Sequence, residues 1–193
     1  MPQKYQSDFE QLKTPSDLMK FMDNNIIYGF VGKSGRKYID QDEQWQKDWF
    51  SECTVQSGDE ILRTKCGTCW DQVELERKWF TDHKYEFKTI FSIFEMDKPN
   101  NYPTHTFLAF KGDNKWYWLE HSFGSYNGIH EFSSLSELVD DVNSKQLKCA
   151  IDNGIATAKD KKLIKNYTYD RPKTGLGVIE YLKHATSGKK LNV

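Results

Sequence analysis

The stretch Thr104–Phe123, THTFLAFKGDNKWYWLEHSF, sets the predicted fold. Both ends are rich in aromatic and apolar residues, and the polar letters KGDN separate them, which is typical of two strands joined by a tight turn. The preceding stretch 84–97, KYEFKTIFSIFEMD, alternates with a period of two and predicts another long strand. A helix is predicted before these strands, over about 68–83. A helix followed by consecutive strands in hairpin order predicts an α+β fold with an antiparallel sheet.

The register of the predicted hairpin places two titratable side chains together. We expect Gly112 and Asp113 to form a two-residue turn of type II′, because glycine suits its first central position. Counting back along the two strands then puts His105 directly opposite Glu120, on the same face. A turn one residue longer would put His121 there instead.

The motif GTCWDQ, residues 67–72, precedes the hairpin and predicts the start of a helix from about Thr68 to about His83. Asp71 lies in its first turn, where an acidic side chain suits the positive end of the helix dipole. A thiol at this end of a helix is surrounded by unpaired N–H groups, which favour the reactive thiolate. Cys69 is therefore the candidate nucleophile.

The remaining elements are expected from apolar period and flanking turn residues. They are helices over 14–25, 40–50, 133–145 and 175–188, an edge strand over 161–170, a loop or short hairpin over 32–40, and a turn over 99–103. Ser16 is the expected N-cap of the first of these helices. Ser134 and Glu137 have the spacing of a capping box at the start of another.

Length and composition limit the possible classes of protein. The 193 residues suit one domain, 1–193, and the net charge of −1 gives no reason to expect a nucleic-acid partner. The apolar runs are too short for a membrane span, and the polar start of the chain lacks a signal core. Four cysteines are too few for a disulfide framework, so a cytoplasmic location is expected.

Cys66 and Cys69 form a Cys-x-x-Cys pair, which has three possible meanings. A zinc site needs four ligands, and no second closely spaced pair is present, so we predict no metal and no cofactor. A redox pair at a helix start resembles thioredoxin, but the preceding stretch 59–65, DEILRTK, is charged and short rather than a buried strand. The redox function remains an alternative to a single nucleophilic thiolate.

A nucleophilic thiolate requires a histidine and a group that orients it. Among the five histidines, His83 and His184 fall near helix ends, and His130 lies in a loop-like segment without a visible partner. His105 differs because the predicted hairpin gives it the carboxylate of Glu120. A carboxylate fixes the imidazole tautomer and stabilises the imidazolium. The alternative is a cross-strand polar pair without catalytic function.

Together these motifs resemble the transglutaminase-like cysteine enzyme superfamily, a papain-related group. The resemblance rests on GTCWDQ at 67–72, THTFLAF at 104–110, KWYWLEHS at 115–122 and the preceding segment PSDLMKFMDNNIIYGF at 15–30. It covers about residues 15–125, and residues 126–193 form a C-terminal extension without a familiar motif. The resemblance implies a papain/transglutaminase-like core in which the nucleophile helix packs on an antiparallel β-sheet.

The resemblance also implies the functions of individual residues. Cys69 is the nucleophile, His105 the base and Glu120 the orienting acid, although the family more often has aspartate in the third place and does not require a residue like Cys66. The backbone N–H of Cys69 is expected in the oxyanion hole. Trp45 and Trp49 are candidates for its second donor by aromatic type alone, and core packing is the alternative for both.

The implied reaction is acyl transfer from an amide through a thioester. The expected activity is that of a thiol hydrolase or acyltransferase whose partner is a peptide or protein amide, either a peptide bond or a glutamine side chain. Hydrolysis is favoured over cross-linking, because nothing in the sequence indicates selection of an amine over water. The alternatives are a dithiol-disulfide oxidoreductase and a non-catalytic binding module with residues 116–118 lining a groove.

Overall fold

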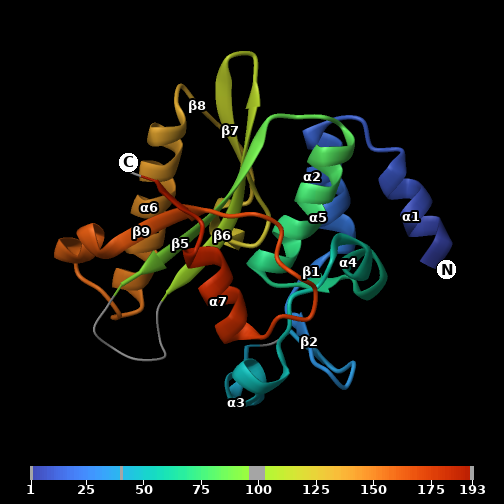
Figure 1. Cartoon of the computed structure of the whole chain (residues 1–193), viewed down its shortest axis with the longest axis horizontal. Coiled ribbons are helices and arrows are strands. Elements are labelled where there is room, and N and C mark those ends of the chain that lie inside the picture. The colour runs from blue at the N-terminus through green and yellow to red at the C-terminus, as the bar shows by residue number, and fades with distance from the viewer. Residues whose placement is uncertain (1, 40, 96–102, 192–193) are drawn as a thin grey trace.

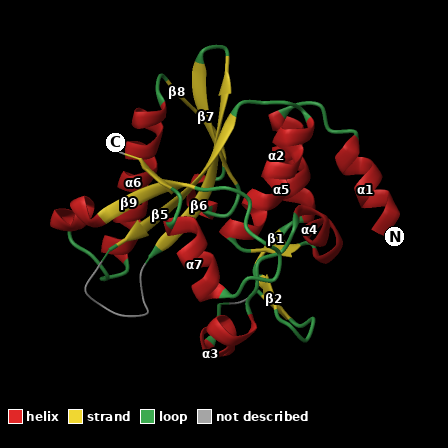
Figure 2. Ribbon diagram, viewed as in Figure 1, coloured by secondary structure: helices red, strands yellow, loops and turns green. Residues whose placement is uncertain are grey.

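A computed structural model describes residues 2–39, 41–95 and 103–191, with side chains from residue 6 onward. A six-stranded sheet in the order β10-β9-β5-β6-β7-β8 crosses the molecule, and every neighbouring pair in it is antiparallel (Figure 2). Its strands are β5 (Phe87–Phe94), β6 (Thr104–Gly112), β7 (Lys115–Glu120), β8 (Gly128–Phe132), β9 (Ile164–Thr168) and β10 (Lys189–Leu191). The expected α+β class with an antiparallel sheet is confirmed.

Helices cover both faces of the sheet (Figure 1). The main ones are α2 (Pro15–Asn25), α5 (Cys69–Asp82), α6 (Leu135–Asp152) and α7 (Val178–Thr186). Successive side chains of β6 point to opposite faces, as in any strand. Leu108 therefore joins the core cluster that holds Trp79 of α5, whereas Phe107 joins the cluster that holds Leu138 of α6. The expected packing of the helix that begins at Cys69 on the sheet is confirmed.

The N-terminal part of the chain adds further short elements that precede α5 in the sequence. These are α1 (Pro2–Glu10), α3 (Glu43–Glu52), α4 (Gly58–Thr64), a parallel pair β1 (Ile27–Tyr28) with β4 (Cys66–Gly67), and the hairpin of β2 (Phe30–Val31) with β3 (Lys37–Tyr38). The hairpin confirms the expectation for residues 32–40. The parallel strand β4 holds the two residues directly before the cap of α5, which fixes where that helix begins.

α5 begins where the sequence predicts, because Thr68 and Asp71 cap it. The Asp71 carboxylate accepts hydrogen bonds from the backbone N–H and the hydroxyl of Thr68, at 3.0 and 2.9 Å. It also accepts the backbone N–H of Gln56 at 2.8 Å, which ties the segment before α4 to the helix. A Cβ atom on Gly67 would lie 2.9 Å from the Cβ of Asp71, so this close packing requires glycine.

The predicted hairpin exists, but its predicted register is wrong by two residues. The structure pairs Gly112 with Lys115, so Asp113 and Asn114 are the central turn residues. Both have positive φ, 48° and 62°, which indicates a type I′ turn instead of type II′. Aspartate and asparagine tolerate this left-handed conformation better than other side chains with a Cβ. Because the shift is an even number of residues, His105 stays on the same face as Glu120.

Other expectations need correction. Thr14, not Ser16, caps α2, and it forms a reciprocal capping box with Asp17. The stretch 161–170 supplies β9, but β10 pairs with its outer side, so β9 is an inner strand. The loop expected around His130 is wrong, because this segment forms the strand β8. The turn expected over 99–103 lies, apart from its last residue, outside the described residues.

The segment expected as an extension, residues 126–193, supplies half of the strands of the main sheet. β8 pairs with β7 at one edge, and β9 pairs with β5 near the other. α6 from the same segment covers one sheet face. In the part of the chain that the structure describes, no helix combines the length and the apolar character needed to cross a bilayer.

Candidate active site

A cavity of about 540 Å³ lies where α5 begins, beside the chain that follows β7 and the last turns of α6. Cys69 and His105 both line it. The other lining residues are Tyr28, Gln41, Pro103, Thr104, His121, Ser122, Phe123, Gly124, Gln146, Cys149, Ala150, Asn153 and Ile155. The structure therefore brings together the predicted nucleophile and the predicted base, which lie 36 positions apart in the sequence.

Cys69 is the first residue of α5, after the N-cap Thr68. The first N–H groups of a helix have no partner within it and point toward any negative group at its start. The Cys69 side chain is partly exposed, whereas Cys53 and Cys66 are buried. A thiolate at this position is accessible to substrate and faces the positive end of the helix dipole.

His105 and Glu120 form a buried pair. The Nε2 atom of His105 lies 2.7 Å from Oε2 of Glu120, and the two residues are 7% and 1% exposed. The carboxylate is fixed by further donors: the Trp118 indole N–H at 3.2 Å on Oε2, and the N–H groups of Ser122 and Phe123 at 2.7 and 2.6 Å on Oε1. Glu120 is therefore held as an anion with a single orientation.

The charges in this pair determine the protonation of the imidazole. Burial alone would lower the pKa of His105, but the charge of Glu120 and the interactions with Cys69 outweigh burial and raise the pKa to about 10. For Glu120, burial is outweighed by the same histidine and by the N–H donors, so its pKa is lowered. Because Nε2 is bonded to Glu120, Nδ1 is the nitrogen left to exchange a proton with Cys69.

Tyr28 is a site residue that the sequence analysis missed. It lines the cavity, and its pKa is raised well above normal, first by burial and then by the negative charge of Cys69. The candidates Trp45 and Trp49 do not line the cavity. Their rings stack on each other at 5.7 Å, and Trp49 stacks on Trp70 at 5.2 Å. Both tryptophans therefore pack in an aromatic cluster, as the alternative interpretation proposed.

His121 and Gln72 connect the chain after β7 to the start of α5. The Nδ1 atom of His121 lies 2.8 Å from the side-chain oxygen of Gln72, and the amide nitrogen of Gln72 donates to the carbonyl of Gly67 at 2.9 Å. Gln72 closes the motif GTCWDQ, which is the signal that marks it. This link holds the loop that carries Ser122 and Phe123 beside the cysteine.

Cys66 does not face the cavity. It lies in β4 and is fully buried, and this burial raises the pKa of its thiol to about 11. Gln56 fixes its backbone by donating to the carbonyl at 2.8 Å. A dithiol mechanism needs a second accessible thiol with thiolate character, and Cys66 has neither property.

We therefore expect Cys66→Ala to leave kcat/KM within about threefold of the wild-type value, since the thiol only fills core space. Steady-state kinetics on an amide substrate measure this, with Cys53→Ala as the matched control, because it removes another buried thiol that does not line the cavity. An enzyme that cycles through a Cys66–Cys69 disulfide would instead lose its activity in Cys66→Ala alone.

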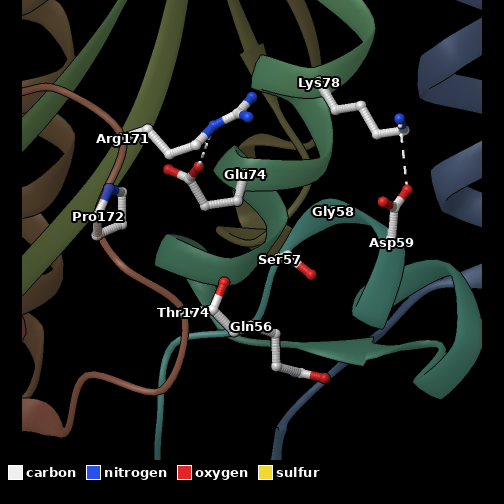
Figure 3. A pocket seen from close by; sticks show the side chains of 9 residues that line it. All are labelled: Gln56, Ser57, Gly58, Asp59, Glu74, Lys78, Arg171, Pro172 and Thr174. Carbon is white, nitrogen blue, oxygen red and sulfur yellow. Dashed lines mark ion pairs between the residues drawn. The ribbon is translucent and has the colours of Figure 1, made fainter.

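A smaller cavity of about 100 Å³ lies between the start of α4, α5 and the chain around Arg171 (Figure 3). Arg171 Nε lies 3.6 Å from the buried Glu74 carboxylate of α5, and Lys78 pairs with Asp59 at 3.4 Å. None of its lining residues is a cysteine or a histidine. These ion pairs attach neighbouring segments to α5.

Comparisons with known proteins give little beyond this geometry. No family model matches the chain, and no curated protein matches it. Among solved structures, the chain is similar to the arylamine N-acetyltransferase (BACCR)NAT3 from Bacillus cereus, which has a Cys-His-Glu catalytic triad, with a TM-score of 0.40 and 12% identity. The match covers 90% of this chain and 61% of that chain, so the chain spans less than two thirds of its neighbour.

Proposed function

We propose that the protein is a thiol enzyme that transfers the acyl group of an amide to water, with Cys69 as nucleophile, His105 as proton carrier and Glu120 as orienting acid. One observation carries the proposal: Cys69 and His105 line the same cavity, while a buried carboxylate fixes the far side of the imidazole at 2.7 Å. This is the arrangement that activates a thiol for acyl transfer.

The first half of the reaction forms a thioester. The Cys69 thiolate attacks the amide carbonyl carbon, and the resulting tetrahedral intermediate carries a negative oxygen. The C–N bond then breaks, and the His105 imidazolium gives its Nδ1 proton to the departing amine. In the second half, His105 takes a proton from water, the hydroxide attacks the thioester, and the acid and the free thiolate are released.

The developing oxyanion requires hydrogen-bond donors beside the sulfur. We propose the backbone N–H of Cys69 as one donor, because the first N–H groups of α5 have no partner within the helix. We propose the Tyr28 hydroxyl as the other, because this residue lines the cavity and lies close enough to Cys69 for its charge to affect the pKa of the phenol.

The lining of the cavity favours a neutral substrate. None of the lining residues named above is Asp, Glu, Lys or Arg, and they include the carboxamides Gln146 and Asn153 and the apolar side chains of Phe123 and Ile155. This suits a peptide bond or a glutamine side chain of a protein or peptide. Water is the proposed acceptor, because Cys69 is partly exposed to solvent.

Alkylation tests the ion pair on which the proposal depends. At about pH 6, iodoacetamide should label Cys69 faster than the exposed Cys149, because only Cys69 has an imidazolium beside it that stabilises the thiolate. Peptide mass spectrometry compares the two rates within one sample, so Cys149 serves as the internal control. His105→Ala should remove the preference. Equal rates in the wild-type protein would contradict the proposal.

Product analysis distinguishes the possible reactions. The protein is incubated with glutamine-containing peptides, and mass spectrometry separates cleavage of the chain from conversion of glutamine to glutamate. Cys69→Ala should abolish whichever product forms. If neither product forms from any of these peptides, although iodoacetamide still labels Cys69 rapidly, amide hydrolysis is excluded.

A further inference from the structure

A second large cavity lies on the α6 side of the sheet, near its β10 edge, and has a volume of about 750 Å³. It lies between α6, β9, β10 and the 3-10 helix Ala158–Leu163. Its lining residues are Asp140, Asn143, Lys159, Lys161, Lys162, Ile164, Lys165, Asn166, Lys190 and Leu191. We propose that this basic cavity binds a small phosphorylated polyol with at least two phosphate groups.

The charge of the lining is the first observation. Five lysines and a single carboxylate line the cavity, in a protein whose net charge is −1. The carboxylate of Asp140 is bonded to Lys161 at 2.8 Å. Within the described residues, Lys159, Lys162, Lys165 and Lys190 form no ion pair. Uncompensated ammonium groups gathered around one cavity repel each other and attract an anion of more than one charge.

A buried amide is the second, independent observation. Asn166 of β9 is 2% exposed, and its Oδ1 atom has no hydrogen-bond partner in the described structure. It pairs across the sheet with Ser92, so both side chains lie on one face, and Ser92 donates to Gln146 of α6 at 2.6 Å. Asn166 therefore points toward α6, into the basic cavity that it lines.

An unpaired buried acceptor is unfavourable unless a donor reaches it. A phosphate at neutral pH offers mainly acceptors, which suit the lysines but not Asn166. A hydroxyl on the same ligand supplies the missing donor. The chemistry of the cavity therefore matches a molecule with phosphates for the ammonium groups and a hydroxyl for the amide oxygen.

The composition of the lining argues against nucleic acid. No aromatic residue lines the cavity, so no platform for stacking bases is present among the lining residues. The buried amide of Asn166 can be reached only by a ligand that enters the cavity. The extended phosphate backbone of a nucleic acid would instead lie on the protein surface. These features favour a small polyol phosphate over a single-stranded oligonucleotide.

Isothermal titration calorimetry with fructose 1,6-bisphosphate tests the proposal on the full chain. Lys162→Ala/Lys165→Ala should weaken binding by at least about tenfold, since it removes two charge-assisted contacts. Lys13→Ala/Lys20→Ala is the matched control, because it removes the same charge from exposed positions on and beside α2 and should leave binding unchanged. Both double variants change exposed or half-exposed side chains, so both are expected to fold.

Three further ligands and one variant define the outcomes. Pyrophosphate should bind more weakly than the bisphosphate in the wild type, and Asn166→Leu should abolish this difference while leaving pyrophosphate binding unchanged. Sulfate at equal ionic strength should not compete. The proposal is overturned if the bisphosphate does not bind, if both lysine pairs contribute equally, or if a single-stranded oligonucleotide binds more tightly.

Discussion

Glu120→Gln is expected to lower kcat/KM for amide hydrolysis by about 10³- to 10⁴-fold, a loss typical of an orienting carboxylate in a catalytic triad. The reason lies in the donors around the carboxylate. Oε1 accepts the N–H groups of Ser122 and Phe123, so the single oxygen of glutamine will occupy that position. The amide nitrogen then faces Nε2 of His105 and donates to it. This holds the imidazole proton on Nδ1, where the thiol proton must be accepted.

The pH dependence of the reactive thiolate should change in the same variant. In the wild type, the pKa of His105 is raised to about 10, so the imidazolium on which the proposed ion pair depends persists at neutral pH and is lost as the pH rises through that value. Without the negative charge of Glu120, burial lowers the pKa, and the imidazolium is lost at a lower pH. The rate of Cys69 alkylation as a function of pH measures this shift.

Glu86→Gln is the matched control, because Glu86 is an exposed carboxylate that pairs with Lys111 at 3.6 Å. It should change neither kcat/KM nor the pH profile. Folding of each variant is compared by circular dichroism and urea unfolding. Wild-type activity in a folded Glu120→Gln protein would show that the carboxylate does not orient the base.

The part of the site that could be predicted rests on two robust signals. The start of α5 follows from local sequence, because Asp71 suits the positive end of the helix dipole, and in the structure it also closes a capping box with Thr68. The shared face of His105 and Glu120 follows from the two-residue period of strands. The predicted hairpin register was wrong by two residues, and a shift by an even number leaves both side chains on the same face. Local sequence therefore predicted the position of Cys69, and the strand period predicted that His105 and Glu120 share a face, although the predicted turn type was wrong.

The remaining features depend on long-range packing. Gln146 and Cys149 line the candidate active site because α6 folds back against the sheet, which no local pattern in 133–152 indicates. β4 is two residues long and pairs in parallel with β1, so it has no detectable period. Glu74 lies in the second turn of α5 and, as a charged side chain, suits an exposed helix face, yet tertiary contacts bury it. Sequence spacing alone cannot distinguish a buried ion pair from an exposed one.

Arg77→Met is expected to lower the free energy of unfolding by about 3 kcal/mol, because it leaves a buried carboxylate without its main partner. Arg77 Nε lies 3.0 Å from Oε1 of Glu74, and the two side chains are only 10% and 4% exposed. The guanidinium also donates to the Thr89 hydroxyl of β5 at 2.8 Å and lies over the Tyr169 ring at 5.4 Å. The arginine thus joins α5 to the sheet as well as neutralising Glu74.

Urea unfolding at neutral pH measures the loss, and its pH dependence identifies the cause. Burial already raises the pKa of Glu74, and without Arg77 the carboxylate will bind a proton at still higher pH. The stability deficit of the variant should therefore shrink as the pH falls and Glu74 becomes neutral, and Glu74→Gln in the same background should recover part of the lost stability.

Arg171→Met is the matched control, because this second partner of Glu74 is 60% exposed and its loss should cost less than about 1 kcal/mol. A deficit that is independent of pH, or equal in the two arginine variants, would mean that packing rather than the unpaired charge sets the stability of α5.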